Sequence, residues 1–162
     1  MCAPETGCIS SRTHAYGSGS SESDGIMRVT VCELPHEPSL LATACSALCD
    51  HTRRHAPELV LLPEFAMVDA VWEGERFDAA RGEAAESLSD AWLDRLRELC
   101  ATYVVGTGPR SAGVRRFNEG YLWSRAEGVV SLRRKYFLPN EPGGWEARWF
   151  DRADRSFPAF RA

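Results

Sequence analysis

A single lysine stands out among the basic residues of this sequence. The chain has 19 lysine and arginine residues, and Lys135 is the one lysine, which leaves 18 arginines. An ammonium group is compact and its pKa responds to its surroundings, whereas a guanidinium group is planar and always charged. Prolines and glycines follow Lys135, and then two tryptophans flank Glu146. A loop that is rich in aromatic residues and follows a strand is a common place for a functional site. Chance retention on a solvated strand end is the alternative interpretation of Lys135.

Glu64 is the second candidate. Residues 58–65 read ELVLLPEF, and their four consecutive aliphatic residues predict a strand buried on both faces, as in the middle of a parallel sheet. The aliphatic run stops at Pro63, so Glu64 lies at the carboxyl end of this strand. Ligands of open α/β sheets bind at that edge. We interpret Glu64 as a functional carboxylate, and a local capping role is the alternative.

The elements around these residues predict an α/β fold. Residues 27–34 form a β-branched run typical of a buried strand, and Pro38 and Ser39 then open a helix whose apolar face includes Leu41, Cys45 and Leu48. This helix leads to the strand at 58–65, so the order strand, helix, strand predicts parallel pairing through a right-handed crossover.

The second half of the chain is expected to bring Lys135 to the sheet. Residues 66–86 are predicted to be an acidic loop or a short helical segment containing Trp72. From Ser87 the sequence predicts a helix with one apolar stripe, and Ser87 with Asp90 resembles a capping box. Residues 102–107 predict a third strand. Residues 117–123 and 129–134 predict a hairpin that turns at Gly128 and ends beside Lys135. The apolar stripe of the helix predicted from Ser87 comprises Leu88, Trp92, Leu96 and Leu99.

Composition limits the classes of function. Hydrophobic residues make up 44% and charged residues 26%, as in a soluble globular domain. The net charge of −4 does not favour binding to nucleic acid or to a membrane surface. No apolar run is long enough to span a membrane, and the first residues do not resemble a secretory signal, so we expect a cytoplasmic protein.

Residues 1–25 are rich in Ser and Gly and are predicted to be a disordered tail, with the folded domain over residues 26–162. The six cysteines follow no disulfide framework, and we expect reduced thiols. Cys2 and Cys8 belong to the tail, Cys32 falls in a predicted strand, and the others fall on predicted helices: Cys45, Cys49 and Cys100. His51 and His55 have the spacing of metal ligands, but without a third ligand we interpret them as a solvated helix end. We expect no metal and no cofactor.

Three segments, in order and well separated, resemble signatures of the carbon–nitrogen hydrolases, the nitrilase superfamily. They are LVLLPEF, NEGYLWSRAEGVVSLRRKYFLP, and EARWFDR followed by SFPAF. The resemblance runs from about Met27 to the end of the sequence. It implies roughly the first half of a nitrilase-like α-β-β-α sandwich. It also implies roles for three residues: Glu64 as general base, Lys135 as stabiliser of the tetrahedral intermediate, and Glu146 as the second glutamate beside the lysine. Glu141 is the alternative for this last role.

The sequence departs from the family in its nucleophile. The family's catalytic cysteine lies on the strand that would follow the present sequence, and none of the six cysteines has that context. The resemblance implies a hydrolase of non-peptide carbon–nitrogen bonds in small amides, nitriles or carbamoyl compounds, acting by a Glu-Lys-Cys mechanism. We expect the chain to be truncated and inactive alone, and to form a homo-oligomer when complete. The alternative is a non-catalytic binding module derived from a nitrilase-like half-domain.

Overall fold

The structure is a computed structural model that describes residues 27–35, 37–68, 70–157 and 159. The predicted tail at residues 1–25, with Cys2 and Cys8, lies outside these residues. The boundary between tail and domain therefore stays a prediction. The described ranges contain no apolar helix of membrane-spanning length.

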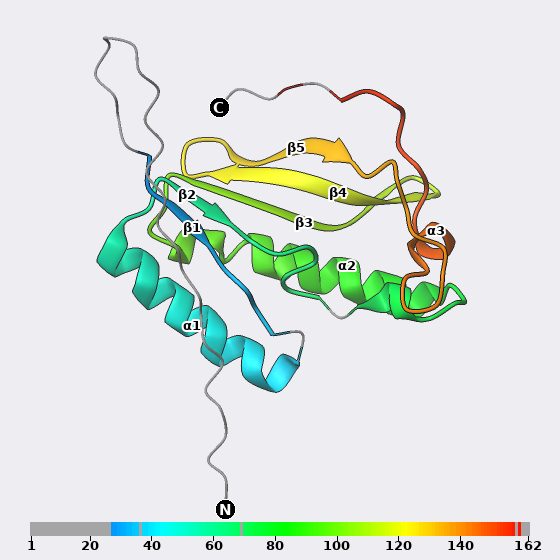
Figure 1. Ribbon diagram of the computed structural model, residues 1–162, viewed down its shortest axis with the longest axis horizontal. Coiled ribbons are helices and arrows are strands. Elements are labelled where there is room, and N and C mark those ends of the chain that lie inside the picture. Colours follow the sequence, from blue (N-terminus) through cyan, green and yellow to red (C-terminus); the bar gives the residue numbers. More distant parts are fainter. Residues whose placement is uncertain (1–26, 36, 69, 158, 160–162) are drawn as a thin grey trace, which may run out of the picture.

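One mixed sheet of five strands forms the centre of the fold, in the order β1-β2-β3-β4-β5 (Figure 1). β1 (Val29–Val31), β2 (Leu59–Leu61) and β3 (Tyr103–Ala112) are parallel. β4 (Arg115–Ser124) and β5 (Gly128–Arg134) continue the sheet in antiparallel hairpins. The predicted α/β class and the parallel pairing of the first strands are confirmed.

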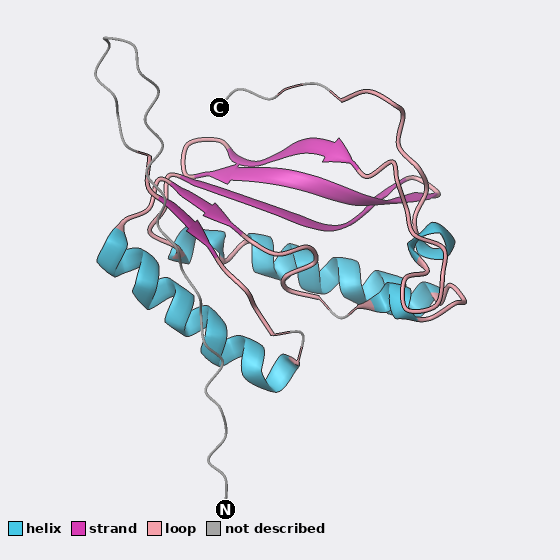
Figure 2. Ribbon diagram, viewed as in Figure 1, coloured by secondary structure: helices cyan, strands magenta, loops and turns pink. Residues whose placement is uncertain are grey.

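Two long helices cover one side of this sheet, as Figure 2 shows. α1 (Pro38–His55) begins with a proline, which is tolerated there because N–H groups in the first turn of a helix make no intrahelical hydrogen bond. The helix is terminated by Ala56, which has a left-handed backbone conformation. α2 (Ala79–Leu93) follows the 3₁₀ turn η1 (Val71–Glu73) and precedes a second turn, η2 (Leu96–Glu98). A short helix, α3 (Glu146–Trp149), lies beyond β5.

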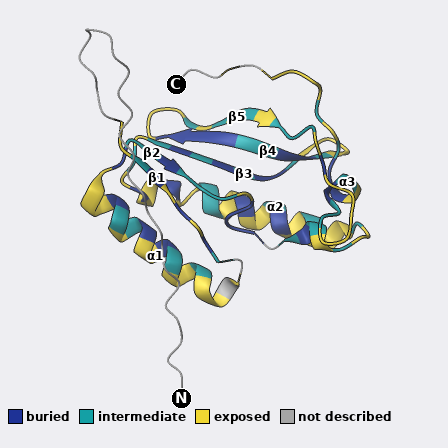
Figure 3. Cartoon of the chain, viewed as in Figure 1, coloured by how far each residue is buried: buried dark blue, intermediate teal, exposed yellow. Residues whose placement is uncertain are grey.

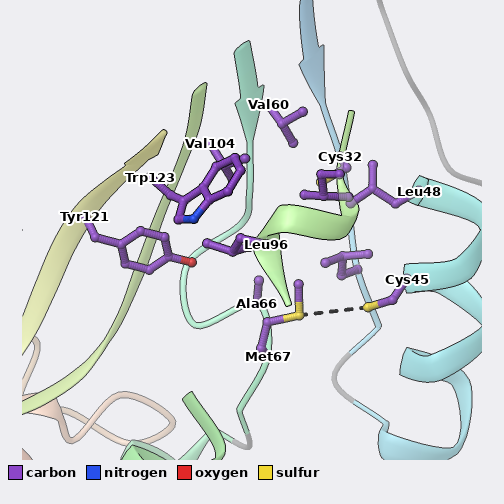
Figure 4. Packing of buried hydrophobic residues seen from close by; sticks show 12 residues of the cluster. Cys32, Cys45, Leu48, Val60, Ala66, Met67, Leu96, Val104, Tyr121 and Trp123 are labelled. Carbon is purple, nitrogen blue, oxygen red and sulfur yellow. Dashed lines mark hydrogen bonds between the residues drawn. The ribbon is translucent and has the colours of Figure 1, made fainter. Parts of the chain in front are cut away.

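The main core lies between these helices and the sheet (Figure 4). Figure 3 shows the same division, with buried residues on the inward side of α1 and along the strands. Inside the core the Cys45 thiol contacts the Met67 sulfur at 3.9 Å. The core comprises Cys32, Leu34, Cys45, Leu48, Val60, Ala66, Met67, Leu96, Leu99, Val104, Tyr121 and Trp123.

The opposite side of the sheet carries a second apolar row. Val104 and Trp123 face the helices, and successive side chains of a strand alternate between faces, so their neighbours point away from the helices. Strand register places five of these neighbours side by side, one from each strand. They are Val31, Leu61, Val105, Leu122 and Val130.

The start and end of α2 correct the prediction. The helix begins at Ala79, and Asp78 caps it by accepting a hydrogen bond from the Arg81 N–H. Ser87 lies inside the helix, so the predicted capping box is wrong. The residues before Ser87 are largely alanine and charged residues, which favour helix without forming an apolar stripe. The predicted apolar stripe does not belong to one continuous helix. α2 ends at Leu93, Leu96 begins η2, and Leu99 follows η2. The first member of the stripe, Leu88, is 44% exposed.

Strand lengths also differ from the prediction. β1 and β2 are shorter than the apolar runs at 27–34 and 58–65, and Cys32 follows β1 instead of lying in it. β3 is longer than 102–107, because it pairs with β4 over its whole length around a turn at Gly113, where φ is +62°. Cys100 lies in the exposed connection before β3 and not on a helix. The hairpin around Gly128 is confirmed, with φ of +71° there, and β4 and β5 change register at Gly120 and Tyr121.

Candidate active site

The structure brings together the three predicted site residues from three separate parts of the chain. The Lys135 Nζ donates to Glu64 Oε1 at 2.8 Å and to Glu146 Oε1 at 2.9 Å. Glu64 follows β2, Lys135 follows β5, and Glu146 begins α3. Glu141 is exposed and pairs with Gly144 in a turn, so Glu146 is the one of the two glutamates that contacts Lys135. The catalytic roles of these residues stay predictions.

Glu64 is held in place by its neighbour Phe65. Phe65 has a positive φ of +49°, which is uncommon for a residue other than glycine and persists only where the surroundings impose it. Its N–H donates to Thr107 Oγ1 at 3.0 Å on β3. Its ring is fully buried, with Trp72 at 4.3 Å and Phe150 at 5.5 Å between ring centroids. These contacts turn the chain sharply after β2 and present the Glu64 carboxylate at the edge of the sheet.

Asn118 joins Glu64 to Lys135, and the sequence analysis missed it. Its side-chain Nδ2 donates to Glu64 Oε1 at 2.7 Å, and its backbone carbonyl accepts from the Lys135 N–H at 2.8 Å. Asn118 is 2% exposed. A buried amide needs hydrogen-bond partners, so an asparagine inside a predicted strand was the signal that could have identified it.

Glu146 supplies the buried carboxylate of the site. Its side chain is 6% exposed, against 30% for Lys135 and 47% for Glu64. Lys135 bonds to Oε1, while Oε2 has no hydrogen-bond partner within the described part of the chain. The short helix that carries Glu146 is anchored at both ends: the Ala147 N–H donates to Pro139 O at 2.9 Å, and the Trp149 indole N–H donates to Gly74 O.

The charge on Lys135 is stabilised by its two partners. Partial burial acts to lower the pKa of Lys135, but the hydrogen bonds and charges of Glu64 and Glu146 outweigh burial and hold it above its ordinary value of 10.5. The lysine is therefore a cation at neutral pH. A cation fixed between two carboxylates at the edge of a sheet can stabilise negative charge on a bound molecule, and the exposed carboxylate can accept a proton.

The thiols of the described residues lie elsewhere. Burial raises the pKa of Cys32 to about 12 and that of Cys45 to about 11, so both are neutral thiols at physiological pH. Burial also raises the pKa of Cys49. The Cys32 thiol donates to Leu61 O, and Cys100 is exposed beyond η2. None of these four cysteines hydrogen-bonds to Glu64, Lys135 or Glu146.

The rings of His51 and His55 contact each other near the end of α1, with their centroids 4.4 Å apart and their planes tilted by 37°. The His51 Nε2 shares a hydrogen bond with Thr30 Oγ1 at 3.2 Å. Within the described ranges no group of three or more His, Cys, Asp or Glu side chains could hold a metal ion.

Comparison with known proteins identifies the fold. The sequence matches no protein-family model and no curated protein. Among solved structures, a carbon–nitrogen hydrolase from Helicobacter pylori G27 superposes with a TM-score of 0.66 at 14% identity, covering 81% of this chain and 46% of that chain. An amidase from Nesterenkonia sp. superposes with a TM-score of 0.63 at 17% identity, covering 84% of this chain and 51% of that chain. The chain has about half of the carbon–nitrogen hydrolase fold.

This likeness covers only part of each matched structure. A glutamine-dependent NAD(+) synthetase from Cytophaga hutchinsonii superposes with a TM-score of 0.59 at 19% identity, over 77% of this chain and 21% of that chain. The chain thus spans about half the length of the hydrolase and amidase structures and less of the synthetase. The predicted family resemblance is confirmed at the level of the fold.

Proposed function

We propose that Glu64, Lys135 and Glu146 serve the hydrolysis of a non-peptide carbon–nitrogen bond in a small amide, nitrile or carbamoyl compound. The observation that carries this proposal is the Lys135 ammonium, which lies within 2.9 Å of one exposed and one buried carboxylate. A merely structural ion pair needs one carboxylate. Here the second, Glu64, stands 47% exposed at the sheet edge where a substrate could reach it.

The reaction needs a thiol in addition to these three residues. The thiol loses its proton to Glu64, and its sulfur attacks the carbon of the amide. The oxygen that becomes negative accepts a hydrogen bond from the Lys135 ammonium. When the intermediate collapses, the carbon–nitrogen bond breaks and the proton on Glu64 passes to the departing ammonia or amine.

The second half of the reaction restores the thiol. The acyl group of the substrate remains bound to the sulfur as a thioester. Glu64 then takes a proton from a water molecule that attacks this thioester. The sulfur leaves with a proton and the carboxylic acid is released. Glu146 keeps Lys135 in position through its Oε1.

The nucleophile of this proposal is not one of the four described cysteines, because none contacts the site and burial leaves the core thiols protonated. The solved structures that share the fold are about twice as long as the matched region. Their length supports a nucleophile contributed by an additional segment.

Ammonia release tests the proposal. The protein expressed from its complete reading frame is incubated with short aliphatic amides and nitriles, alongside Lys135→Ala, Lys135→Arg and Glu64→Gln. We expect turnover to fall on the order of 100- to 1000-fold in both lysine variants, because a planar guanidinium cannot replace the compact ammonium. The control is Arg53→Ala, which removes a cation from an exposed pair with Asp50 on α1 and should leave turnover unchanged.

Two results would contradict it. Absence of ammonia release from every amide and nitrile would overturn the hydrolase and favour the non-catalytic binding module. Turnover in Lys135→Arg above about a tenth of normal would leave Lys135 as a general positive charge and remove its oxyanion role.

A further inference from the structure

A cavity separate from the candidate active site lies between α2, the β3–β4 hairpin and α3. Its volume is about 340 Å³, within the range of roughly 300–1,000 Å³ that small-molecule sites occupy. None of Glu64, Lys135 and Glu146 lines it. Its lining comes from the first turns of α2, the tip of the β3–β4 hairpin and the end of α3. These segments lie at the right of Figure 1.

One wall of the cavity is apolar and largely aromatic. Trp149 and Phe150 come from the end of α3, Phe77 precedes α2, and Val71 comes from η1. Trp149 is 2% exposed and is fixed by its indole N–H bond to Gly74 O. Gly82 of α2 also lines the cavity, and a Cβ there would lie 3.2 Å from the Phe77 ring, so the glycine lets this ring pack closely against α2. This wall offers apolar and aromatic surface to a flat or branched apolar group.

The charged groups of the lining differ in how far they are already satisfied. Arg110 pairs with Asp90 at 2.7 Å, and the Glu86 carboxylate accepts from the Ser111 N–H and hydroxyl at 2.7 and 2.6 Å. Arg116 is half-buried and has no carboxylate within ion-pair distance among the described residues.

The Arg116 guanidinium is fixed yet retains donors. Its Nε donates to Trp149 O at 3.0 Å, and its central carbon lies 3.6 Å from the centroid of the Phe77 ring. Its two terminal amino groups make no hydrogen bond to the described residues. A planar guanidinium with two free amino groups matches a carboxylate in a bidentate arrangement.

The acidic residues of the lining restrict the charge of the ligand. Glu83 and Glu86 both border the cavity and would repel a second negative charge on a bound molecule. A phosphate or a dicarboxylate is therefore disfavoured against a single carboxylate.

We propose that this cavity is a binding site for a small monocarboxylic acid with an aromatic or branched aliphatic group. The carboxylate binds the terminal amino groups of Arg116, and the apolar group packs against Phe77, Trp149 and Phe150. The site is distinct from Glu64, Lys135 and Glu146, so it stands whether or not these three residues hydrolyse amides.

Isothermal titration calorimetry with phenylacetate tests the site, with phenylacetamide as the neutral isostere and phenethylamine as the cationic one. We expect phenylacetate to bind to the full chain, and phenylacetamide to bind about tenfold or more weakly, because a hydrogen bond to a charged group is lost. Arg116→Met keeps the aliphatic stem and should remove the preference for the acid. Ala79→Leu narrows the mouth of the cavity at an exposed position and should weaken both ligands equally.

Arg53→Ala, at an exposed position of α1 that does not line this cavity, is the matched control and should bind phenylacetate as the unchanged chain does. Circular dichroism of each variant establishes that it is folded. Should Arg116→Met fail to fold, the comparison of acid with amide and the Ala79→Leu variant still decide the question. Equal binding of acid and amide, tighter binding of the amine, or no binding of any of them overturns the proposal.

Discussion

Replacing Lys135 with methionine would leave the buried carboxylate of Glu146 without a partner. Lys135 is the only hydrogen-bond donor to Glu146 Oε1 in the described part of the chain, and Oε2 has none. Methionine keeps most of the lysine stem and removes its charge. The variant therefore isolates the electrostatic contribution of the lysine to folding, which can be measured whether or not the chain has enzymatic activity.

The burial of the two side chains sets the size of the effect. Removing one member of a buried ion pair typically costs 3–5 kcal/mol, because the remaining charge stays buried and unpaired. Glu146 meets this condition at 6% exposure, but Lys135 is 30% exposed and is partly screened by water. We therefore expect about 3 kcal/mol, at the lower end of that range. For a domain of this size this corresponds to a fall in melting temperature of about 10 °C.

A double-mutant cycle measured by urea unfolding checks this prediction. Glu146→Gln removes the buried charge while keeping the shape, so Lys135→Met in that background should cost only about 1 kcal/mol, as for one ordinary hydrogen bond. Glu64→Gln is the comparison on the exposed side and should cost less than about 1 kcal/mol. If Lys135→Met costs the same in both backgrounds, the lysine does not stabilise the fold through Glu146.

Three further predictions concern other properties of the chain. The folded-state pKa of Lys135 is raised above the ordinary value of 10.5, so the contribution of its charge to stability is complete below pH 10.5 and is lost as the pH rises through the folded-state pKa. Urea unfolding above pH 10.5 should show this loss of stability in the unchanged chain and not in Lys135→Met. Iodoacetamide at neutral pH should label Cys100, which is exposed, and leave the buried Cys32 unlabelled, as peptide mass spectrometry will show; rapid labelling of Cys32 would contradict its raised pKa. Gly106→Ala should lower the free energy of unfolding by about 1–3 kcal/mol, because the new Cβ would lie 2.5 Å from the Tyr121 hydroxyl oxygen. In a Tyr121→Leu background most of this loss of stability should disappear, and an equal loss in both backgrounds would rule out the clash.

The contact of Lys135 with Glu64 and Glu146 was easier to predict from the sequence than the start of α2. Glu64 and Lys135 were identifiable because each follows a strand that the residue pattern marks clearly. β2 and β5 run in the same direction, so their carboxyl ends lie at the same edge of the sheet. Bringing Glu146 to the same place required the family resemblance, since no periodicity relates a loop residue to a strand end. The beginning of α2 was missed because its first turns are alanine-rich and bury little.

Asn118 was missed for a different reason. Its importance depends on which residues lie opposite it, and strand register is a property of the folded sheet. The sequence indicated that residues 117–123 and 129–134 pair, but it did not indicate the register change near Gly120. The same limit applies to the cavity beside Arg116, whose walls come from four separate segments.

That register change has a consequence for which face of the sheet Lys135 occupies. Next to the Gly128 turn, Trp123 pairs with Val129 and Tyr121 pairs with Ser131. The next residue of β4, Gly120, pairs with Arg133, so β5 contains one more residue than β4 over this stretch. Continued without that extra residue, the alternation would place Lys135 opposite Phe117, whose side chain is buried on the helix-covered face. With it, Lys135 lies opposite Asn118, on the face that Glu64 reaches. The one extra residue in β5 therefore places Lys135 on the same face of the sheet as its two carboxylates. Deleting one residue of β5 would move the Lys135 side chain to the opposite face, although all three site residues would still be present in the sequence.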